Sequence, residues 1–333
     1  MPANLTPDFL AAEATFRKAR DPGERLACLR EMLRLIPKHK GTDHLQGDIK
    51  RRIKELSEEL ERPRKGGARS GPTLVIRPEG AAQVALIGPP NTGKSSLHAR
   101  LTGSGAHAAP YPFTTQYPEP GMMPYEDIHF QLVDLPAVSP EHPVGWMVGT
   151  LETADAALLV VDLSDPACVE QLELVHAVLR ERRVTLTDRW EPAVESEDPF
   201  ALRLPTLLIA NKADRVAEPD DELQAFLEVA GLRYPALAGS ATTGQGLGKI
   251  GPWLFEHIGI VRVYTKAPGQ PADAGRPFTL RRGQTVADVA ALVHKDLARS
   301  LKYARVWGKS GFEGQHVGRY HPVSDGDAIE LHV

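Results

Sequence analysis

Residues 88–95, GPPNTGKS, have the residue types and spacing of a phosphate-binding loop. The pattern Gly-x-x-x-x-Gly-Lys-Ser is typical of a loop between a strand and a helix, where backbone N–H groups and the helix dipole face phosphate oxygens. Lys94 is predicted to bring positive charge to the terminal phosphates, and the Ser95 hydroxyl is predicted to ligate Mg²⁺. The residues expected to hold the phosphates are Gly88, Asn91, Thr92, Gly93, Lys94, Ser95 and Ser96.

Residues 211–214, Asn-Lys-Ala-Asp, follow a short apolar run 117 positions after Lys94. A carboxylate at Asp214 can accept hydrogen bonds from the ring N–H and the exocyclic amine of guanine. Adenine presents a different edge and would leave that carboxylate unpaired, which allows strong discrimination. The Lys212 stem is expected to cover the base while its charged head stays in water. The residues expected around the base are Asn211, Lys212, Asp214, Ser240 and Ala241, the last two through backbone N–H groups.

Two further motifs indicate a metal ion and a mobile loop. Asp134 ends an apolar run and begins the sequence Asp-Leu-Pro-Ala, which places a carboxylate where it can hold Mg²⁺ through water. Residues 111–115, YPFTT, supply hydroxyl groups, and Thr115 is expected to close on Mg²⁺ only when the terminal phosphate is present. The predicted metal ligands are therefore Ser95, Thr115 and Asp134.

Alternating strands and helices must position these residues. Apolar runs predict strands at 82–87, 128–133, 157–161 and 207–209, and helical patterns lie between them at 168–180 and 221–229. This alternation is typical of an α/β fold, a parallel sheet with helices on both faces. The acidic residues 186–204 are predicted to form an insertion loop.

The two ends of the chain have different patterns. Asp21-Pro22-Gly23-Glu24 resembles a capped helix start, and apolar residues at spacings of three and four predict helices over 26–36 and 45–60. Residues 62–72 are rich in Pro, Gly and Arg and indicate a linker. Beyond residue 260, strands at 261–264, 304–307 and 328–333 surround a helix that begins after Thr285 and includes Leu297. We therefore predict three domains, at residues 1–70, 71–259 and 260–333.

Composition excludes several classes of protein. Of 333 residues, 42% are hydrophobic and 25% charged, which excludes a mainly disordered or collagen-like chain. The first domain carries 16 basic and 11 acidic residues, the second 12 and 25, and the third 11 and 7. Basic ends suit a polyanion such as RNA, although they are equally compatible with ordinary solvated surfaces. Two cysteines, Cys28 and Cys168, indicate neither zinc nor disulfides, and with no signal peptide or membrane-length apolar run we expect a cytoplasmic protein without a membrane partner.

These motifs together resemble the Obg-type branch of translation-factor GTPases, and most closely the developmentally regulated GTP-binding protein subfamily. The resemblance covers roughly residues 24–333. It implies a P-loop GTPase domain with an N-terminal helical hairpin and a C-terminal β-grasp module called a TGS domain, and a ribosome or RNA partner. The segments that carry it are residues 36–60, 88–97, 101–121, 134–137, 211–214, 240–241 and 261–333.

Some positions depart from the family pattern. Ala137 stands where the family has Gly, and Val138 where Ras-like proteins place a Gln that orients water. The stretch between Asp134 and Asn211 is too short for the small domain that the subfamily usually inserts there. In potassium-activated relatives an Asn at the position of Asn91 helps ligate a monovalent cation, so K⁺ is expected here beside Mg²⁺, with Lys94, Asn91 and Thr115 as the catalytic residues.

The sequence therefore predicts a Mg²⁺-dependent enzyme that hydrolyses GTP to GDP and phosphate, as a switch acting on ribosomes or RNA. Two alternatives remain open. One is a non-catalytic scaffold that binds nucleotide without turnover and uses its helical and TGS modules for binding. The other is an ATPase, which residues 211–214 argue against.

Overall fold

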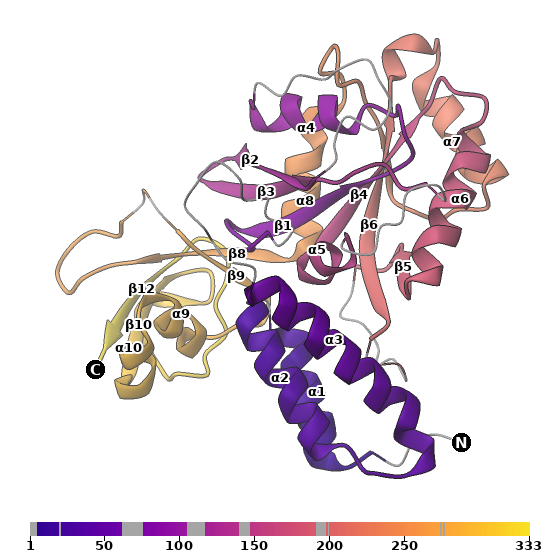
Figure 1. Ribbon diagram of the computed structural model, residues 1–333. Coiled ribbons are helices and arrows are strands. Elements are labelled where there is room, and N and C mark those ends of the chain that lie inside the picture. Colours follow the sequence, from indigo (N-terminus) through magenta and orange to yellow (C-terminus); the bar gives the residue numbers. More distant parts are fainter. Residues whose placement is uncertain are drawn as a thin grey trace, which may run out of the picture. The chain divides into compact units, whose positions relative to one another are not determined.

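The computed structural model describes residues 5–19, 21–61, 76–104, 117–139, 147–190, 198, 200–273, 275 and 277–333 (Figure 1). It divides into two compact units. The first comprises residues 1–78 with 195–200, and the second comprises residues 79–194 with 201–333. The predicted linker at 62–72 lies outside the described residues. No described helix is both long and apolar enough to cross a membrane.

The first unit is helical, with α1 (Pro7–Lys18), α2 (Pro22–Leu35), a 3₁₀ turn (Lys40–Thr42) and α3 (Asp43–Glu61). The side chain of Asp21 accepts hydrogen bonds from the N–H groups of Gly23 and Glu24 and so caps α2 as predicted. Helix α1, capped by Thr6, was not predicted from the sequence. The three helices share one apolar core, formed by Phe9, Phe16, Leu29, Met32, Ile36, Ile49 and Phe200.

The second unit begins with the predicted α/β fold. Its sheet has the order β2-β3-β1-β4-β6-β5, with β7 also paired to β6. All neighbouring strands run parallel except β2, which is antiparallel to β3. The strands are β1 (Ala82–Ile87), β2 (Glu119–Tyr125), β3 (Ile128–Asp134), β4 (Ala156–Asp162), β5 (Val184–Thr187), β6 (Leu202–Asn211) and β7 (Ala236–Ala238).

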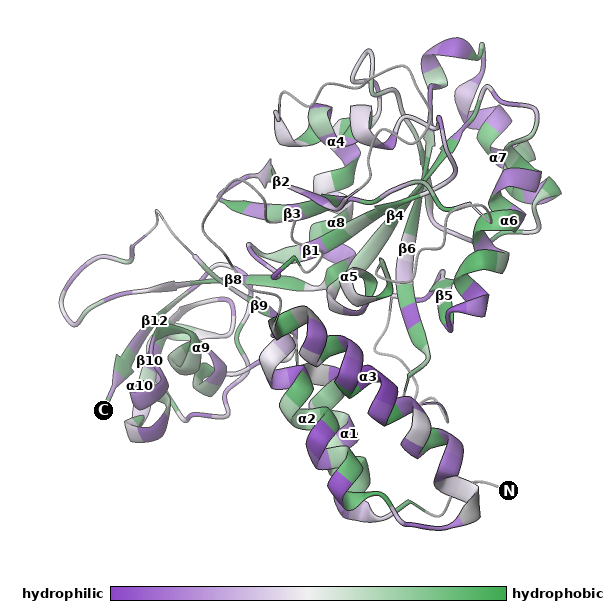
Figure 2. Ribbon diagram, in the orientation of Figure 1, coloured by the Kyte–Doolittle hydropathy of each residue, from purple (hydrophilic) through white to green (hydrophobic). Residues whose placement is uncertain are grey.

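Helices cover both faces of this sheet, because its strands are apolar on both sides. In β4, Ala156, Leu158 and Val160 pack in one core with residues of α4 and α8. The alternate residues of β4 point to the opposite face and are equally buried. Figure 2 shows the inner strands as the most hydrophobic part of this unit. The helices are α4 (Lys94–Thr102), α5 (Met147–Thr153), α6 (Cys168–Glu181), α7 (Pro219–Val229) and α8 (Ile250–Ile258), with 3₁₀ turns at Ala213–Arg215 and Leu247–Lys249.

The prediction of one insertion loop over 186–204 is wrong at both of its ends. Leu186 and Thr187 belong to β5, and β6 starts at Leu202 and pairs with β5 in parallel. Phe200 is buried in the core of the helical unit. The polar and acidic composition of this segment does not predict strands. Its two strand ends form because they pair with each other. Most of the residues between them lie outside the described part of the chain.

The C-terminal domain is a second sheet with the order β11-β10-β12-β8-β9. Its β12 and β8 run parallel and its other pairs antiparallel. Thr285 and Asp288 form a capping box at the start of α9, as the sequence indicates. The helix predicted through Leu297 is wrong, because extended backbone at His294 ends α9 and starts α10. The elements are β8 (Ile260–Thr265), β9 (Phe278–Arg281), α9 (Val286–Val293), α10 (Lys295–Ser300), β10 (Tyr303–Gly308), β11 (Gly311–Val317) and β12 (Asp327–His332).

Arg262 of β8 links this sheet to the turn between β2 and β3. Its guanidinium donates to Asp127 at 2.9 Å and to Asp325 at 2.8 Å, and it also pairs with Glu126. The Tyr264 hydroxyl donates to the other oxygen of Asp127. Burial acts against ionisation of Asp127, but the hydrogen bonds from Tyr264 and Arg262 outweigh it and lower the pKa of this carboxyl. The C-terminal sheet is therefore tied to the first sheet by charge-assisted hydrogen bonds.

Candidate functional site

The loop between β1 and α4 takes a form that requires glycine at two positions. Gly93 has φ of 86°, and a Cβ there would lie 2.5 Å from the side-chain nitrogen of Asn211. A Cβ on Gly88 would lie 2.2 Å from the carbonyl oxygen of Val160 on β4. Both glycines let the loop lie against the carboxyl ends of neighbouring strands, where ligands bind in open α/β sheets.

Lys94 begins α4 and is almost fully buried, with 7% of its surface exposed. Its ammonium group donates to the carbonyl oxygen of Pro89 at 2.7 Å, within the phosphate loop. Burial lowers its pKa to about 8, and the nearby charge of Asp134 acts in the opposite direction. The loop thus holds a desolvated cation that is still largely protonated at neutral pH.

Ser95 and Asp134 come together beneath the loop. The Ser95 hydroxyl donates to a carboxylate oxygen of Asp134 at 2.5 Å, and Asp134 is fully buried. A hydroxyl and a carboxylate are the hard oxygen ligands that Mg²⁺ prefers, so these residues fit the predicted ion. The described residues contain no group of three His, Cys, Asp or Glu side chains that could hold a metal on their own. Water and phosphate oxygens would therefore complete the coordination of a bound Mg²⁺.

Asn211, at the end of β6, joins two segments of the site. Its side-chain N–H donates to the carbonyl oxygen of Thr92 at 2.8 Å, and its side-chain oxygen accepts from the N–H of Ala241 at 2.9 Å. The N–H of Ser240 donates to the carbonyl of Gln245. The amides of Ser240 and Ala241, predicted to face guanine, are thus engaged within the protein. The sequence did not indicate this bracing role for Asn211.

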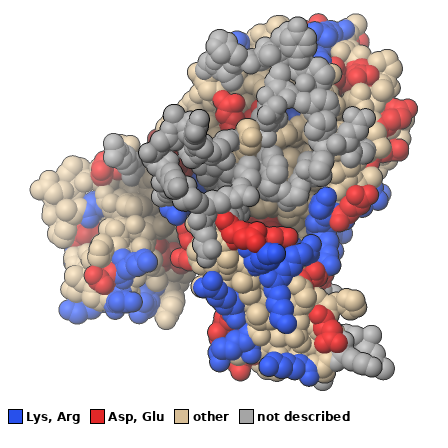
Figure 3. Space-filling view, viewed as in Figure 1, with Lys and Arg blue, Asp and Glu red and all other residues tan. Residues whose placement is uncertain are grey.

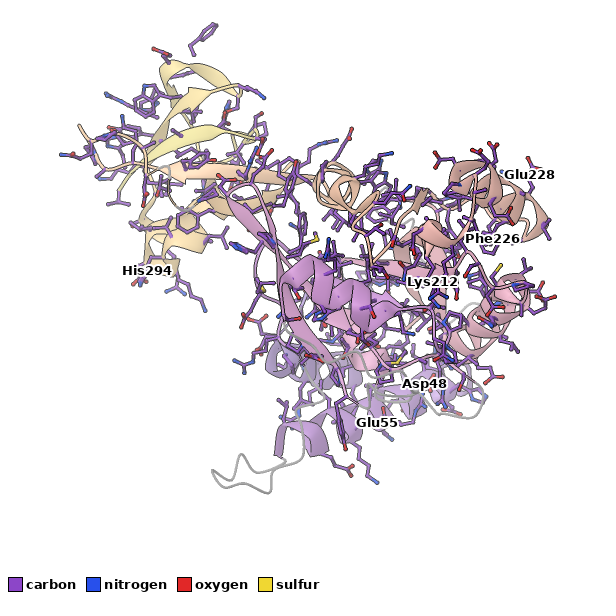
Figure 4. All side chains as sticks on the ribbon, turned by 90° about the horizontal axis from the view of Figure 1, so that it is seen from above. Asp48, Glu55, Lys212, Phe226, Glu228 and His294 are labelled. Atoms are coloured by element: carbon purple, nitrogen blue, oxygen red, sulfur yellow. The ribbon has the colours of Figure 1, made fainter. Side chains whose placement is uncertain are left out.

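Lys212, labelled in Figure 4, has a left-handed backbone with φ of 63°. Its ammonium group donates to the carbonyl oxygen of Asn91 at 2.7 Å and to Asp162 at 2.5 Å. Asp162, at the end of β4, was not predicted as a site residue. Its backbone is paired with Asn211 in the parallel register of β4 and β6, and this proximity could not be read from the sequence.

Asp214, predicted to contact the base, lies in the short 3₁₀ turn after β6 and is exposed. Ser96 is half-buried in the first turn of α4. Asn91 has φ of 62°, and its residue is exposed at the loop surface. The structure therefore places the residues predicted to bind the phosphates and the carboxylate predicted to contact the base at the same edge of one sheet.

Thr115 and the rest of residues 111–115 lie outside the described residues. The backbone at Ala137 does not have a positive φ, so this position does not require glycine. The N–H of the next residue, Val138, donates to the carbonyl of Gly88 at 3.1 Å, and its side chain is buried. The segment after Asp134 thus packs against the phosphate loop in this structure.

Comparison with known proteins identifies two domains in the chain. Residues 83–189 match the family described as 50S ribosome-binding GTPase, and residues 261–333 match the TGS domain. The chain is 27% identical to an uncharacterized GTP-binding protein of Methanocaldococcus jannaschii, covering 92% of each. It is also 26% identical to developmentally-regulated GTP-binding protein 2 of Homo sapiens, covering 92% of this chain and 98% of the human one.

Solved structures agree on the fold. The YchF GTPase of Schizosaccharomyces pombe superposes with a TM-score of 0.51, covering 77% of this chain and 99% of that one at 14% identity. Over 92% of its length the chain is similar to developmentally regulated G-proteins. The two domain matches identify it as a GTP-binding protein with a GTPase domain followed by a TGS domain.

Proposed function

We propose that the protein hydrolyses GTP to GDP and phosphate with Mg²⁺ as cofactor, and that it acts as a nucleotide-dependent switch on ribosomes or RNA. The observation that carries this proposal is the hydrogen bond from Asn211 to Thr92. It fixes the segment that would recognise the base against the loop that would bind the phosphates, so that one nucleotide can contact both.

The chemistry follows from the groups at this edge. Water attacks the γ-phosphate in line with the leaving oxygen, and the backbone N–H groups of residues 88–95 stabilise the charge that develops. Lys94 exchanges its hydrogen bond with Pro89 for one with the terminal phosphates. Bound Mg²⁺ would neutralise charge on the β- and γ-phosphates, held by Ser95, by Asp134 and, in the GTP state, by Thr115.

Base selection is assigned to Asp214, with Lys212 covering one face of the ring. The bonds from the Lys212 ammonium group to Asn91 and Asp162 support this role, because they hold its stem extended beside the loop. Asn211 is proposed to support the pocket, with Ser240 and Ala241 forming its wall. These contacts favour GTP over ATP.

A monovalent cation is the proposed substitute for a catalytic side chain. Val138 stands where a water-orienting Gln is expected, and its buried side chain has no group that could act on water. Asn91 is exposed at the loop surface, where its amide oxygen can help ligate K⁺ beside the leaving oxygen. We therefore propose that K⁺ stimulates hydrolysis.

The lack of a water-orienting side chain at Val138 favours a second candidate function, a scaffold that binds nucleotide without turnover. Release of radiolabelled phosphate from GTP distinguishes the two. We expect slow, Mg²⁺-dependent release that disappears in Lys94→Ala and persists in Lys249→Ala, a matched change of an exposed lysine. If the wild type releases no more phosphate than Lys94→Ala does, the scaffold is favoured. Equal turnover of ATP would instead refute the proposed base selection.

A further inference from the structure

Asp162, the last residue of β4, is a buried acid whose two carboxylate oxygens are both occupied. One oxygen accepts the ammonium group of Lys212 at 2.5 Å. The other accepts the N–H of Ser164 at 3.0 Å and the Ser164 hydroxyl at 2.7 Å. Burial raises the pKa of this carboxyl, but the hydrogen bonds from Lys212 and Ser164 outweigh burial and lower it. Asp162 is therefore a charged acceptor with a fixed orientation at neutral pH.

Two consecutive carbonyl groups of the phosphate loop are held by two consecutive side chains at the end of β6. The Lys212 ammonium group donates to the carbonyl oxygen of Asn91 at 2.7 Å. The Asn211 amide donates to the carbonyl oxygen of Thr92 at 2.8 Å. In a trans peptide the C=O and the N–H point in opposite directions. These two bonds therefore turn the N–H groups of Thr92 and Gly93 the other way, as an anion-binding loop requires.

The bond between Lys212 and Asn91 joins two strained backbone positions. Asn91 has φ of 62° and Lys212 has φ of 63°, a left-handed conformation that residues with a side chain rarely adopt. Such a conformation persists only where the surrounding contacts hold it. A lysine stem is long and flexible, so its ammonium group needs an anchor to stay on one carbonyl. In this structure Asp162 supplies that anchor.

We propose that Asp162 is a positioning residue of the nucleotide site. It holds the Lys212 ammonium group on the Asn91 carbonyl and so keeps the phosphate loop in its anion-binding form. Ser164 contributes by fixing the orientation of the Asp162 carboxylate. Because the ion pair is neutral as a whole, Lys212 braces the loop instead of attracting the phosphates. The inference rests on the proposed placement of the nucleotide between the phosphate loop and residues 211–214, and it does not depend on hydrolysis.

Charge and geometry predict opposite effects of removing this carboxylate. The GTPase domain is acidic, and Figure 3 shows acidic side chains on its outer side near α6 and α7. Helix α7 begins with the exposed residues Asp220, Asp221 and Glu222. By charge alone, neutralising Asp162 would lessen the repulsion of an anionic ligand and strengthen the binding of GDP. A positioning role instead predicts weaker binding of GDP.

The test measures binding of a fluorescent GDP analogue to the full chain, together with thermal unfolding. We expect Asp162→Asn to weaken binding about tenfold, because the Lys212 ammonium group loses its charged partner. Ser164→Ala should weaken binding in the same direction by about threefold, since the carboxylate stays but is less well oriented. Asp165→Asn is the matched control. This acid lies in the same turn, but it accepts from Ala167 and Gln171 at the start of α6, so GDP affinity should not change.

A double-mutant cycle with Lys212→Met shows whether Asp162 acts through Lys212. In the Lys212→Met background, Asp162→Asn should cause no further loss of GDP affinity. A further loss of about tenfold in that background overturns the inference, because Asp162 would then act by another route. If Asp162→Asn unfolds too readily for the assay, Ser164→Ala takes its place in the same cycle.

Two other outcomes also overturn the inference. One is GDP affinity in Asp162→Asn that equals or exceeds that of the wild type, which is the result expected from charge alone. The other is an equal loss of affinity in Asp165→Asn, which would indicate a general effect on the turn after β4. The experiment measures GDP binding and not turnover. A wild type that binds GDP but releases no phosphate from GTP would therefore count against the proposed hydrolysis alone.

Discussion

The side-chain N–H of Asn211 donates to the carbonyl oxygen of Thr92, although 119 positions separate the two residues. The other end of the same side chain accepts the N–H of Ala241. One amide thus connects the phosphate loop, the end of β6 and the segment that follows β7. A neutral amide can donate from its nitrogen and accept at its oxygen at once, which is what these two contacts require.

Asn211→Asp is therefore expected to damage the site more than its similar shape suggests. The aspartate keeps the acceptor for Ala241 but loses the donor and turns an oxygen towards the Thr92 carbonyl. Leaving buried groups unpaired costs about 1–3 kcal/mol. We expect GTP affinity, measured by calorimetry, to fall about tenfold or more, with a lower unfolding temperature. Wild-type affinity in Asn211→Asp would show that this link does not support the pocket.

Asp214→Asn should change the base that is bound. An amide offers a donor where guanine requires an acceptor, so GTP affinity should fall by about 100-fold or more while xanthosine triphosphate gains affinity. Competition against a fluorescent nucleotide measures both. Asp220→Asn, an exposed change at the start of α7, should leave both affinities as they are. If Asp214→Asn binds GTP and xanthosine triphosphate as the wild type does, Asp214 does not recognise the base.

Binding of GTP should weaken above about pH 8. The pKa of Lys94 is lowered to about 8 by burial in the nucleotide-free protein, so its charge is lost as the pH rises through this value. A bound triphosphate favours the charged form, so binding takes up a proton and affinity falls up to about tenfold per pH unit there. Calorimetry in buffers of different ionisation enthalpy detects this uptake. Lys94→Arg, which stays charged, should show a flat profile; a similar decline in that variant would assign the titration to another group.

Hydrolysis should be faster in potassium than in sodium chloride, and Asn91→Ala should remove the difference. The reason is that a K⁺ ion held by the Asn91 amide neutralises charge on the leaving oxygen. Phosphate release in matched salts measures the effect, with nucleotide affinity followed in parallel. If the wild type hydrolyses GTP at the same rate in both salts, the potassium proposal is wrong, whereas the proposal of a Mg²⁺ site is not affected.

Arg262→Met should loosen the link between the two sheets. It removes the guanidinium that contacts Asp127 and Asp325, at an expected cost of about 1–3 kcal/mol of unfolding free energy. The pKa of both carboxyls is lowered in the folded state, because the hydrogen bonds they accept outweigh their burial. Their stabilisation is therefore present above the unfolded carboxyl pKa of about 4 and is lost as the pH falls below it. Thermal unfolding of variant and wild type should converge in acid, with Arg282→Met as the exposed control.

The sequence predicted those parts of the structure that depend on local patterns. The strand before the phosphate loop, the helix after it and the position of residues 211–214 after a strand are set by apolar periodicity and glycine spacing. Short strands such as β5 and β9 were not predicted, because they are stabilised by pairing with other strands rather than by their own composition.

The contacts within the site were harder to predict. The contact between Lys212 and Asp162 depends on the register of β4 against β6. The hydrogen bond from Ala241 to Asn211 depends on how the loop after β7 folds back. Neither is encoded in a local pattern. The motif identified the residues of the pocket, whereas the hydrogen bonds that brace them come from tertiary structure.

The junction between the two sheets has a mechanical consequence. Gly259 alone separates the end of α8 from the start of β8, and Arg281 adds a bond to Asp155 beside β1. A protease needs several residues of accessible, unpaired backbone, so digestion should not release the C-terminal domain as a fragment at this point. A force that a bound macromolecule exerts on that domain would therefore be transmitted to the β2–β3 hairpin, because no flexible linker lies between them to absorb it.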